Sequence, residues 1–204
     1  SFIRIIRLLA FIISIFTPAL YIALTTHNQE ALPLSFLLNF MAQRQSVPFS
    51  ALTEALFMSI SFEILRESDI RKQSATGSAI SILGGLILGD AAVSAGIISP
   101  IMIIVISISA ISGLAFSSQE MIASLRWLRF LMMFLAMFFG IFGIYIGFLF
   151  LLSSLVTTKA LNYPYFAPFS PLIKEELGDT IIKLRSKKRL KRNPLLTKNK
   201  KRGS

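Results

Sequence analysis

The chain has 204 residues, of which 54% are hydrophobic and only 15% are charged, with a mean hydropathy of +0.70. An ordinary soluble domain has roughly 45–50% apolar and about 25% charged residues, so the composition excludes that class and predicts an integral membrane protein. The net charge of +11 is local, because eleven of the 21 Lys and Arg residues fall between Lys183 and Arg202, and this favours contact with anionic lipid headgroups over nucleic-acid binding.

The first apolar segment, residues 2–26, is predicted to be a membrane-spanning helix. Arg4 and Arg7 precede its uncharged centre in the manner of a signal peptide, but no small-x-small cleavage site follows. We therefore expect a retained span, in a fragment whose upstream part is missing. Pro18 should kink this helix because proline removes one backbone hydrogen bond. A polar connector, residues 27–46, follows.

Residues 47–69 are predicted to form an additional helix that is neither a surface helix nor a simple span. At 100° per residue, Glu54 and Glu63 would point to nearly opposite sides of it. We expect this helix to be packed within the protein or an oligomer, near the membrane interface or partly re-entrant.

The next apolar stretch, residues 76–116, carries Asp90 as its single formal charge. At about 1.5 Å per residue it is nearly twice as long as the ~30 Å thickness of a bilayer core, so it must contain two spans. We place them at residues 76–96 and 99–117, divided near Gly96 and Pro100. The last span, residues 130–157, has no formal charge and should tilt or protrude.

These segments predict an all-α, polytopic helical membrane protein with about four spans plus an interfacial or re-entrant helix. Residues 1–172 would form the membrane domain, and residues 173–204 a basic cytosolic tail that is partly disordered. Four spans place both termini on one side of the membrane, and the basic tail makes that side the cytosol.

Asp90 is the most informative single residue. An ionised carboxylate near the middle of a span costs about 2.5–3.5 kcal/mol. We favour an Asp90 that faces water in a pore together with Ser94 and attracts cations; the alternative is a carboxyl that is protonated or hydrogen-bonded between helices.

Small side chains recur at steps of three or four residues along the same helix and, more weakly, in the last span. Such a stripe lets helices approach closely, so we expect packing in a bundle or homo-oligomer, with a pore lined by small residues as the alternative. The positions are Ser81, Gly85, Gly89, Ala92 and Gly96, followed by Gly143 and Gly147.

Several charged residues outside the spans are candidates for ion pairs. Helical spacing relates Glu63 to Arg66 and Glu67 to Arg71. The remaining candidates are Glu54, Glu120, Arg126 and Arg129. Anchoring at lipid headgroups is the simpler role for the last three, and a network on the gate side of a channel is the alternative.

Motifs for catalysis or cofactor binding are missing from the sequence. It has no cysteine and a single histidine, His27, and it contains no P-loop, zinc motif or serine nucleophile elbow. We therefore expect no enzyme activity, no cofactor and no metal site.

Four segments, in order along the chain, are VPFSALTEAL at 47–56, FEILRE at 62–67, AAVSAGIISP at 91–100 and PYFAP at 164–168. Together they resemble the membrane domain of the GerA family, the A subunits of bacterial spore germinant receptors. The resemblance implies a receptor in the spore inner membrane, in which A subunits oligomerise into a cation-conducting channel. It also implies a transporter-like B subunit that binds the nutrient, a lipoprotein C subunit, and a large soluble N-terminal domain that this sequence lacks.

Three alternatives stay open at the level of sequence. One is the auxiliary sporulation-stage AF relative, a germination channel that does not sense nutrients. Another is a secondary transporter, although no internal symmetry is visible. The third is a structural subunit, for which exchanging Asp90 for Asn would leave ion flux unchanged.

Overall fold

The computed structural model describes residues 2–71, 75–116, 118–160 and 163–164. Within the described helices, the side chains of residues 68–83, of Leu86 and of Gln119 are not part of the description, nor are those from 159 onward. The predicted tail, residues 173–204, lies outside the described residues. The chain divides into two compact units, residues 9–147 and residues 1–8 with 148–204. The contacts between helices and the pocket described below lie within residues 9–147.

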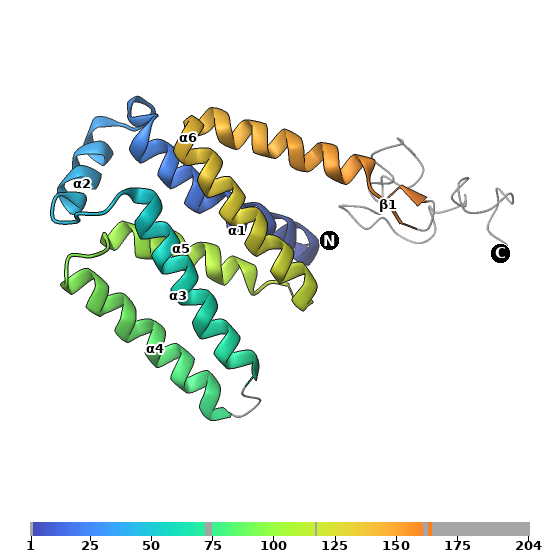
Figure 1. Ribbon diagram of the computed structural model, residues 1–204, viewed down its shortest axis with the longest axis horizontal. Helices are drawn as coiled ribbons and strands as arrows, with labels where there is room; N and C mark the ends of the chain where they lie inside the picture. Colours follow the sequence, from blue (N-terminus) through green and yellow to red (C-terminus); the bar gives the residue numbers. More distant parts are fainter. Residues whose placement is uncertain (1, 72–74, 117, 161–162, 165–204) are drawn as a thin grey trace, which may run out of the picture. The chain divides into compact units, whose positions relative to one another are not determined.

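The fold is all-α, as predicted, and its longer helices follow the apolar segments of the sequence (Figure 1). In chain order the elements are α1 (Phe2–Thr26), η1 (Gln29–Ala31), α2 (Leu34–Arg44), α3 (Ala51–Arg71), α4 (Ala75–Ser94), α5 (Pro100–Gly113) and α6 (Gln119–Thr157). Two short strands, β1 (Lys159–Ala160) and β2 (Tyr163–Pro164), pair antiparallel.

Helix α3 lies beside α4 and packs against α5, and α2 also contacts α5 (Figure 1). The segment predicted as a polar connector, residues 27–46, therefore contains a short 3-10 helix and an eleven-residue α-helix. Leu34, Phe36, Leu38 and Met41 are exposed on α2. The sequence analysis did not predict this helix, which contacts α5.

The interior contains small and polar side chains beside large apolar ones such as Ile15 and Met102, and many other large apolar side chains face outward. On α3 the buried stripe contains Ala51, Glu54, Ala55, Met58 and Ser59, at helical spacing. On the same helix, Phe57, Ile60 and Ile64 are exposed by half or more. An exposed apolar surface of this kind is expected where lipid is the solvent, since acyl chains solvate Phe and Ile as well as a protein core does.

Helix α6 is interrupted at Gly140, where the backbone has φ 60° and ψ −140°. The single continuous helix expected over residues 130–157 is therefore not what the structure shows. A Cβ atom at Gly147 would lie 2.6 Å from Met132 Sδ, and one at Gly143 would overlap the Leu135 carbonyl oxygen. The segment after Gly140 thus folds back against the segment before it.

Two of the described helices are long and apolar enough to cross a membrane by length and composition, Phe2–Thr26 and Glu120–Thr157. The apolar helix Pro100–Gly113 is shorter. The four spans of the sequence prediction coincide with helices, but their crossing of a membrane stays a prediction.

Candidate functional site: a charged pocket between α3, α4 and α5

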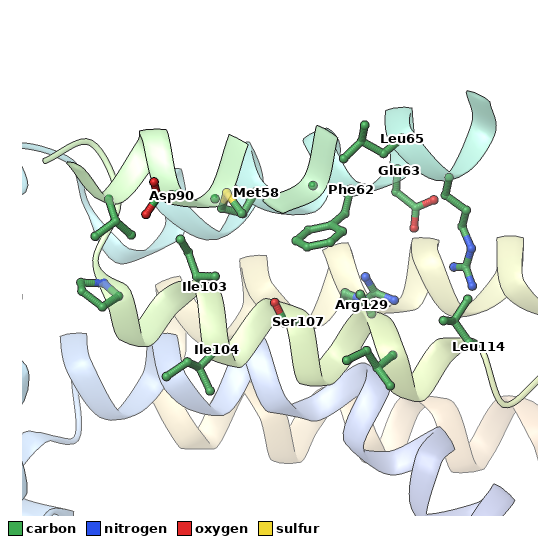
Figure 2. A pocket seen from close by; sticks show the side chains of 17 residues that line it. Met58, Phe62, Glu63, Leu65, Asp90, Ile103, Ile104, Ser107, Leu114 and Arg129 are labelled. Atoms are coloured by element: carbon green, nitrogen blue, oxygen red, sulfur yellow. The ribbon is translucent and has the colours of Figure 1, made fainter. Parts of the chain in front are cut away.

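A pocket of about 800 Å³ opens between α3, α4 and α5, and Arg129 of α6 reaches it (Figure 2). Its walls are mainly apolar, with Met58 and Phe62 from α3 and Ile103, Ile104 and Leu114 from α5 and its end. Its polar lining consists of Glu63, Arg66, Asp90, Ser107 and Arg129. The pocket therefore combines an apolar interior with a few charged groups, which is the usual composition of a ligand site.

Asp90 and Arg129 lie at opposite ends of this pocket (Figure 2). Asp90 is exposed on α4, so its carboxylate has access to the surroundings of the protein. Ser94, the other predicted pore residue, is exposed at the last residue of α4 and lies outside the described lining of the pocket. Both residues are exposed on α4, four positions apart, and their shared role in lining a pore stays a prediction.

The small residues of α4 let it approach its neighbours. A Cβ atom at Gly85 would lie 3.7 Å from Leu65 of α3, and one at Gly89 would lie 3.8 Å from Ile103 of α5. Ala92 is buried. Gly84, which the sequence analysis left out, is tighter still, since its Cβ would lie 3.2 Å from Leu65. The side chain of Ser81 lies outside the described residues.

Gly96 ends α4 and does not belong to its packing stripe. It lies beyond Ser94, with φ 67°, and its N–H donates to the carbonyl of Val93. A left-handed residue directly after a helix is a common C-terminal cap and favours glycine. This turn brings the chain back to Ser99, the N-cap of α5.

Arg129 is almost fully buried, with 3% of its surface exposed, and it binds a carbonyl that Pro18 has freed. Pro18 has no N–H, so the carbonyl oxygen of Ser14, four residues earlier, lacks its helical donor. Arg129 Nε donates to this oxygen over 3.1 Å, and Ser109 Oγ donates to it over 2.6 Å. Arg129 Nη2 also donates to Ser14 Oγ over 3.3 Å. One proline thus creates the acceptor that joins α1 to α5 and α6.

Among the described residues, three guanidinium groups and one carboxylate lie close to this point. Arg126 Nη2 lies 2.9 Å from Glu63 Oε2, which pairs α6 with α3. Arg66 Nη2 is buried and has no hydrogen-bond partner among the described residues. A Cβ atom at Gly113 would lie 3.7 Å from Arg66 and 3.8 Å from Arg129, so both arginines border the same glycine. Glu63 thus pairs with Arg126 of α6, and not with Arg66 as the helical spacing predicted.

Glu54 forms a second buried polar contact, at the start of α5. Only 1% of its surface is exposed, and its Oε2 accepts a hydrogen bond from the Ser99 backbone N–H over 2.8 Å. Arg44 at the end of α2 lies 3.4 Å from its other carboxylate oxygen. A carboxylate at a helix N-terminus is stabilised by the free N–H groups and the helix dipole.

Other predicted site residues stand apart from these contacts. Glu120 is exposed at the start of α6. Glu67 is exposed on α3, and the side chain of Arg71 lies outside the described residues, so the predicted pair between them stays a prediction. Gly143 and Gly147 lie closest to other residues of α6, namely Leu135 and Met132, and not to another helix.

Sequence reasoning missed Ser14, Arg44, Ser99 and Ser109 as partners of the charged residues. For Ser14 a signal was present, because a proline inside a helix always frees the carbonyl four residues before it. The other three partners depend on which helices meet, and the sequence carries no local mark of that.

Within the described part of the chain, no group of three or more His, Cys, Asp or Glu residues could hold a metal ion. The chemistry available in the pocket is electrostatic: Asp90 lies at one end, Arg66, Arg129 and Glu63 lie at the other, and the walls between them are apolar (Figure 2). Such a site can bind or guide ions and amphiphiles.

Comparisons with known proteins identify the family. The model of the Bacillus/Clostridium GerA spore germination protein matches residues 1–195. Spore germination protein KA of Bacillus subtilis is 39% identical over 182 residues, covering 89% of this chain and 34% of that protein. Spore germination protein GerQA of Bacillus cereus is 34% identical, covering 95% and 41%. An uncharacterized membrane protein of Bacillus subtilis, YfkQ, is 37% identical, covering 90% and 36%.

No solved structure matches the chain. The chain spans between about a third and two fifths of the length of these curated relatives. The match nevertheless includes all six α-helices, from Phe2 to Thr157. The chain therefore belongs to the GerA family of spore germination proteins.

Proposed function

We propose that this chain is the membrane part of a germinant-receptor A subunit that oligomerises and conducts cations when the spore senses a nutrient. The family match over residues 1–195 carries this proposal. Supporting it, two helices have the length and composition of membrane spans, and large apolar side chains face outward on α3.

Asp90 is the residue on which we base cation attraction. It is exposed on α4, and a carboxylate in an apolar helix is costly unless it has a role or a partner. The small residues Gly85 and Gly89 let α4 lie close to its neighbours, and Ser94 continues the exposed end of the same helix. In an oligomer, α4 of each copy would supply one carboxylate to a common pore.

The assembly that we propose contains further copies of this chain, a transporter-like B subunit, a lipoprotein C subunit and membrane lipids. Its site would be the inner membrane of the spore, crossed several times by each A subunit. The basic segment 183–202 would face the cytosol, because Lys and Arg are enriched on that side.

Ion flux from spores tests the proposal. Spores would carry the full-length protein with Asp90→Ala or Asp90→Asn, at protein levels matched to the wild type. We expect slower potassium release on nutrient addition for both variants. Glu30→Gln is the matched control, because it removes an exposed carboxylate in η1, away from the pocket. Normal potassium release from the Asp90 variants would refute the pore role of Asp90 and would favour a structural subunit.

A further inference from the structure

We propose that the pocket between α3, α4 and α5 binds an anionic phospholipid, with its phosphate at Arg66 and Arg129 and one acyl chain along the apolar walls. This inference requires that the chain lies in a bilayer, but it does not rest on cation conduction.

The charge balance at one end of the pocket calls for an anion. Among the described residues, Arg126 is the one of these three arginines with a carboxylate within ion-pair distance, namely Glu63 at 2.9 Å. Arg129 donates to the uncharged oxygens of Ser14, and Arg66 Nη2 is buried without a hydrogen-bond partner among the described residues. A buried cation such as Arg129, and a partly buried one such as Arg66, is costly without an anion beside it.

Arginine also has the right geometry for a phosphate. Its planar guanidinium presents several N–H donors at once and can bind two phosphate oxygens together. Basic pockets between membrane helices are known binding places for anionic lipid headgroups. Arg66 and Arg129 both line this pocket, and both border Gly113, so a single phosphate group could reach the two side chains.

The rest of the pocket fits a hydrocarbon chain and fixes its direction. A volume of about 800 Å³ lies within the roughly 300–1,000 Å³ typical of ligand sites. Phe62, Ile103 and Ile104 supply apolar walls between the two charged ends (Figure 2). Asp90 at the far end would repel an anionic headgroup, whereas Glu63 at the other end is paired with an arginine of α6 and lies beside two further arginines, so the phosphate belongs at the arginine end.

Native mass spectrometry of the purified chain tests this inference. The chain would be stripped of lipid in detergent and then given phosphatidylglycerol, phosphatidylcholine or palmitate at equal concentrations. We expect one tightly retained phosphatidylglycerol per chain and weaker retention of phosphatidylcholine. Equal retention of the two phospholipids would overturn the proposal, as would a preference for palmitate over phosphatidylglycerol.

Three variants locate the binding. Arg66→Gln should weaken phosphatidylglycerol binding about fivefold, the effect of losing one basic contact with an anionic lipid. Ala110→Phe should also weaken binding, because Ala110 lines the pocket and the larger side chain fills it while every charge is kept. Arg7→Gln is the matched control, since it removes an exposed arginine outside the pocket.

The basic segment 183–202 is unchanged in all of these proteins, so its own attraction for anionic lipid cancels in the comparison. Unchanged phosphatidylglycerol binding by both Arg66→Gln and Ala110→Phe would overturn the proposed site. Because this experiment measures lipid on the purified chain, its failure would leave the potassium-release test of the proposed function untouched.

Discussion

Single residues inside this protein are stabilised by partners that lie far away in the sequence. Glu54 accepts from Ser99, 45 residues later, and the Ser14 carbonyl accepts from Arg129, 115 residues later. Both contacts satisfy a backbone group that its own helix leaves unpaired: an N–H at the start of α5 and a carbonyl opposite Pro18. Buried polar groups of this kind fix how neighbouring helices pack, because water cannot reach the site to replace a lost hydrogen-bond partner.

Replacing Glu54 should therefore destabilise the protein strongly. Glu54→Ala leaves the buried Ser99 N–H without its acceptor, which costs about 1–3 kcal/mol. Glu54→Gln keeps an acceptor oxygen and should cost less. Thermal unfolding in detergent measures both. Glu120→Ala, at an exposed position of α6, is the control and should change the midpoint little. Equal midpoints for Glu54→Ala and Glu120→Ala would contradict the capping role of Glu54.

At the scale of elements, α6 departs furthest from its sequence pattern. Its apolar run predicts one long span, yet its backbone leaves helical geometry at Gly140. Two residues of the loop after α1 hold this break. Asn28 Oδ1 accepts from the Ile141 N–H over 3.1 Å, and His27 Nε2 lies 2.5 Å from the Met137 carbonyl oxygen. Each contact satisfies a backbone group freed by the interruption, as a cap does at an ordinary helix end.

An alanine at Gly140 should disrupt this arrangement. Its Cβ would lie 2.5 Å from Asn28 Oδ1, and its backbone conformation is nearly restricted to glycine, which alone costs about 1–3 kcal/mol. We expect a clear fall in the unfolding midpoint of Gly140→Ala. The matched control is Gly89→Ala, because that Cβ meets only Ile103 at 3.8 Å within a regular helix. A midpoint for Gly140→Ala at or above that of Gly89→Ala would show that the break is not required.

A cysteine pair can report the fold-back of α6 directly, because the chain has no cysteine of its own. Met132→Cys combined with Gly147→Cys should form a disulfide on mild oxidation, since a Cβ at Gly147 would lie 2.6 Å from Met132 Sδ. In a continuous helix the two positions would be about 22 Å apart. Loss of maleimide labelling, restored by reduction, measures the bond. Trp127→Cys with Gly147→Cys is the control pair, and persistent labelling of the first pair would mean that α6 is straight.

At the scale of the whole molecule, many large apolar side chains are exposed, which a soluble protein avoids. Ala136, Ser14 and Ser109 are buried, whereas Phe138 is 70% exposed and Trp127 is 76% exposed. Exposing this much apolar surface to water is unfavourable, whereas lipid acyl chains solvate it well. The distribution of basic residues then predicts which side the polar segments face.

Cysteine labelling in intact cells tests that topology. With four spans, a cysteine at Gln43 in α2 should react with a membrane-impermeant maleimide, and one at Ser186 should react only after permeabilisation. Both positions lie outside the predicted spans, and Gln43 is exposed. Labelling of Ser186→Cys in intact cells would place the basic segment outside. That result would follow if the fold-back at Gly140 changes the number of crossings by one.

The sequence by itself determined the class of the protein, the positions of its longer helices and its family. Although their crossing of a membrane stays a prediction, the expected segments 2–26, 47–69, 76–96 and 99–117 overlap α1, α3, α4 and α5. This succeeds because hydrophobic length and helix breakers such as Gly96 and Pro100 act locally, and the four family segments are local too.

Only the tertiary structure decided which polar groups meet. Glu63 pairs with Arg126 of α6 and not with Arg66 on its own helix. Arg129 donates to the Ser14 carbonyl freed by Pro18, and α6 is interrupted at Gly140, beside Asn28. These outcomes depend on which helices lie side by side, and no single segment specifies its neighbours. A buried charge or an unpaired backbone group is satisfied by whatever partner the packing brings within hydrogen-bond distance.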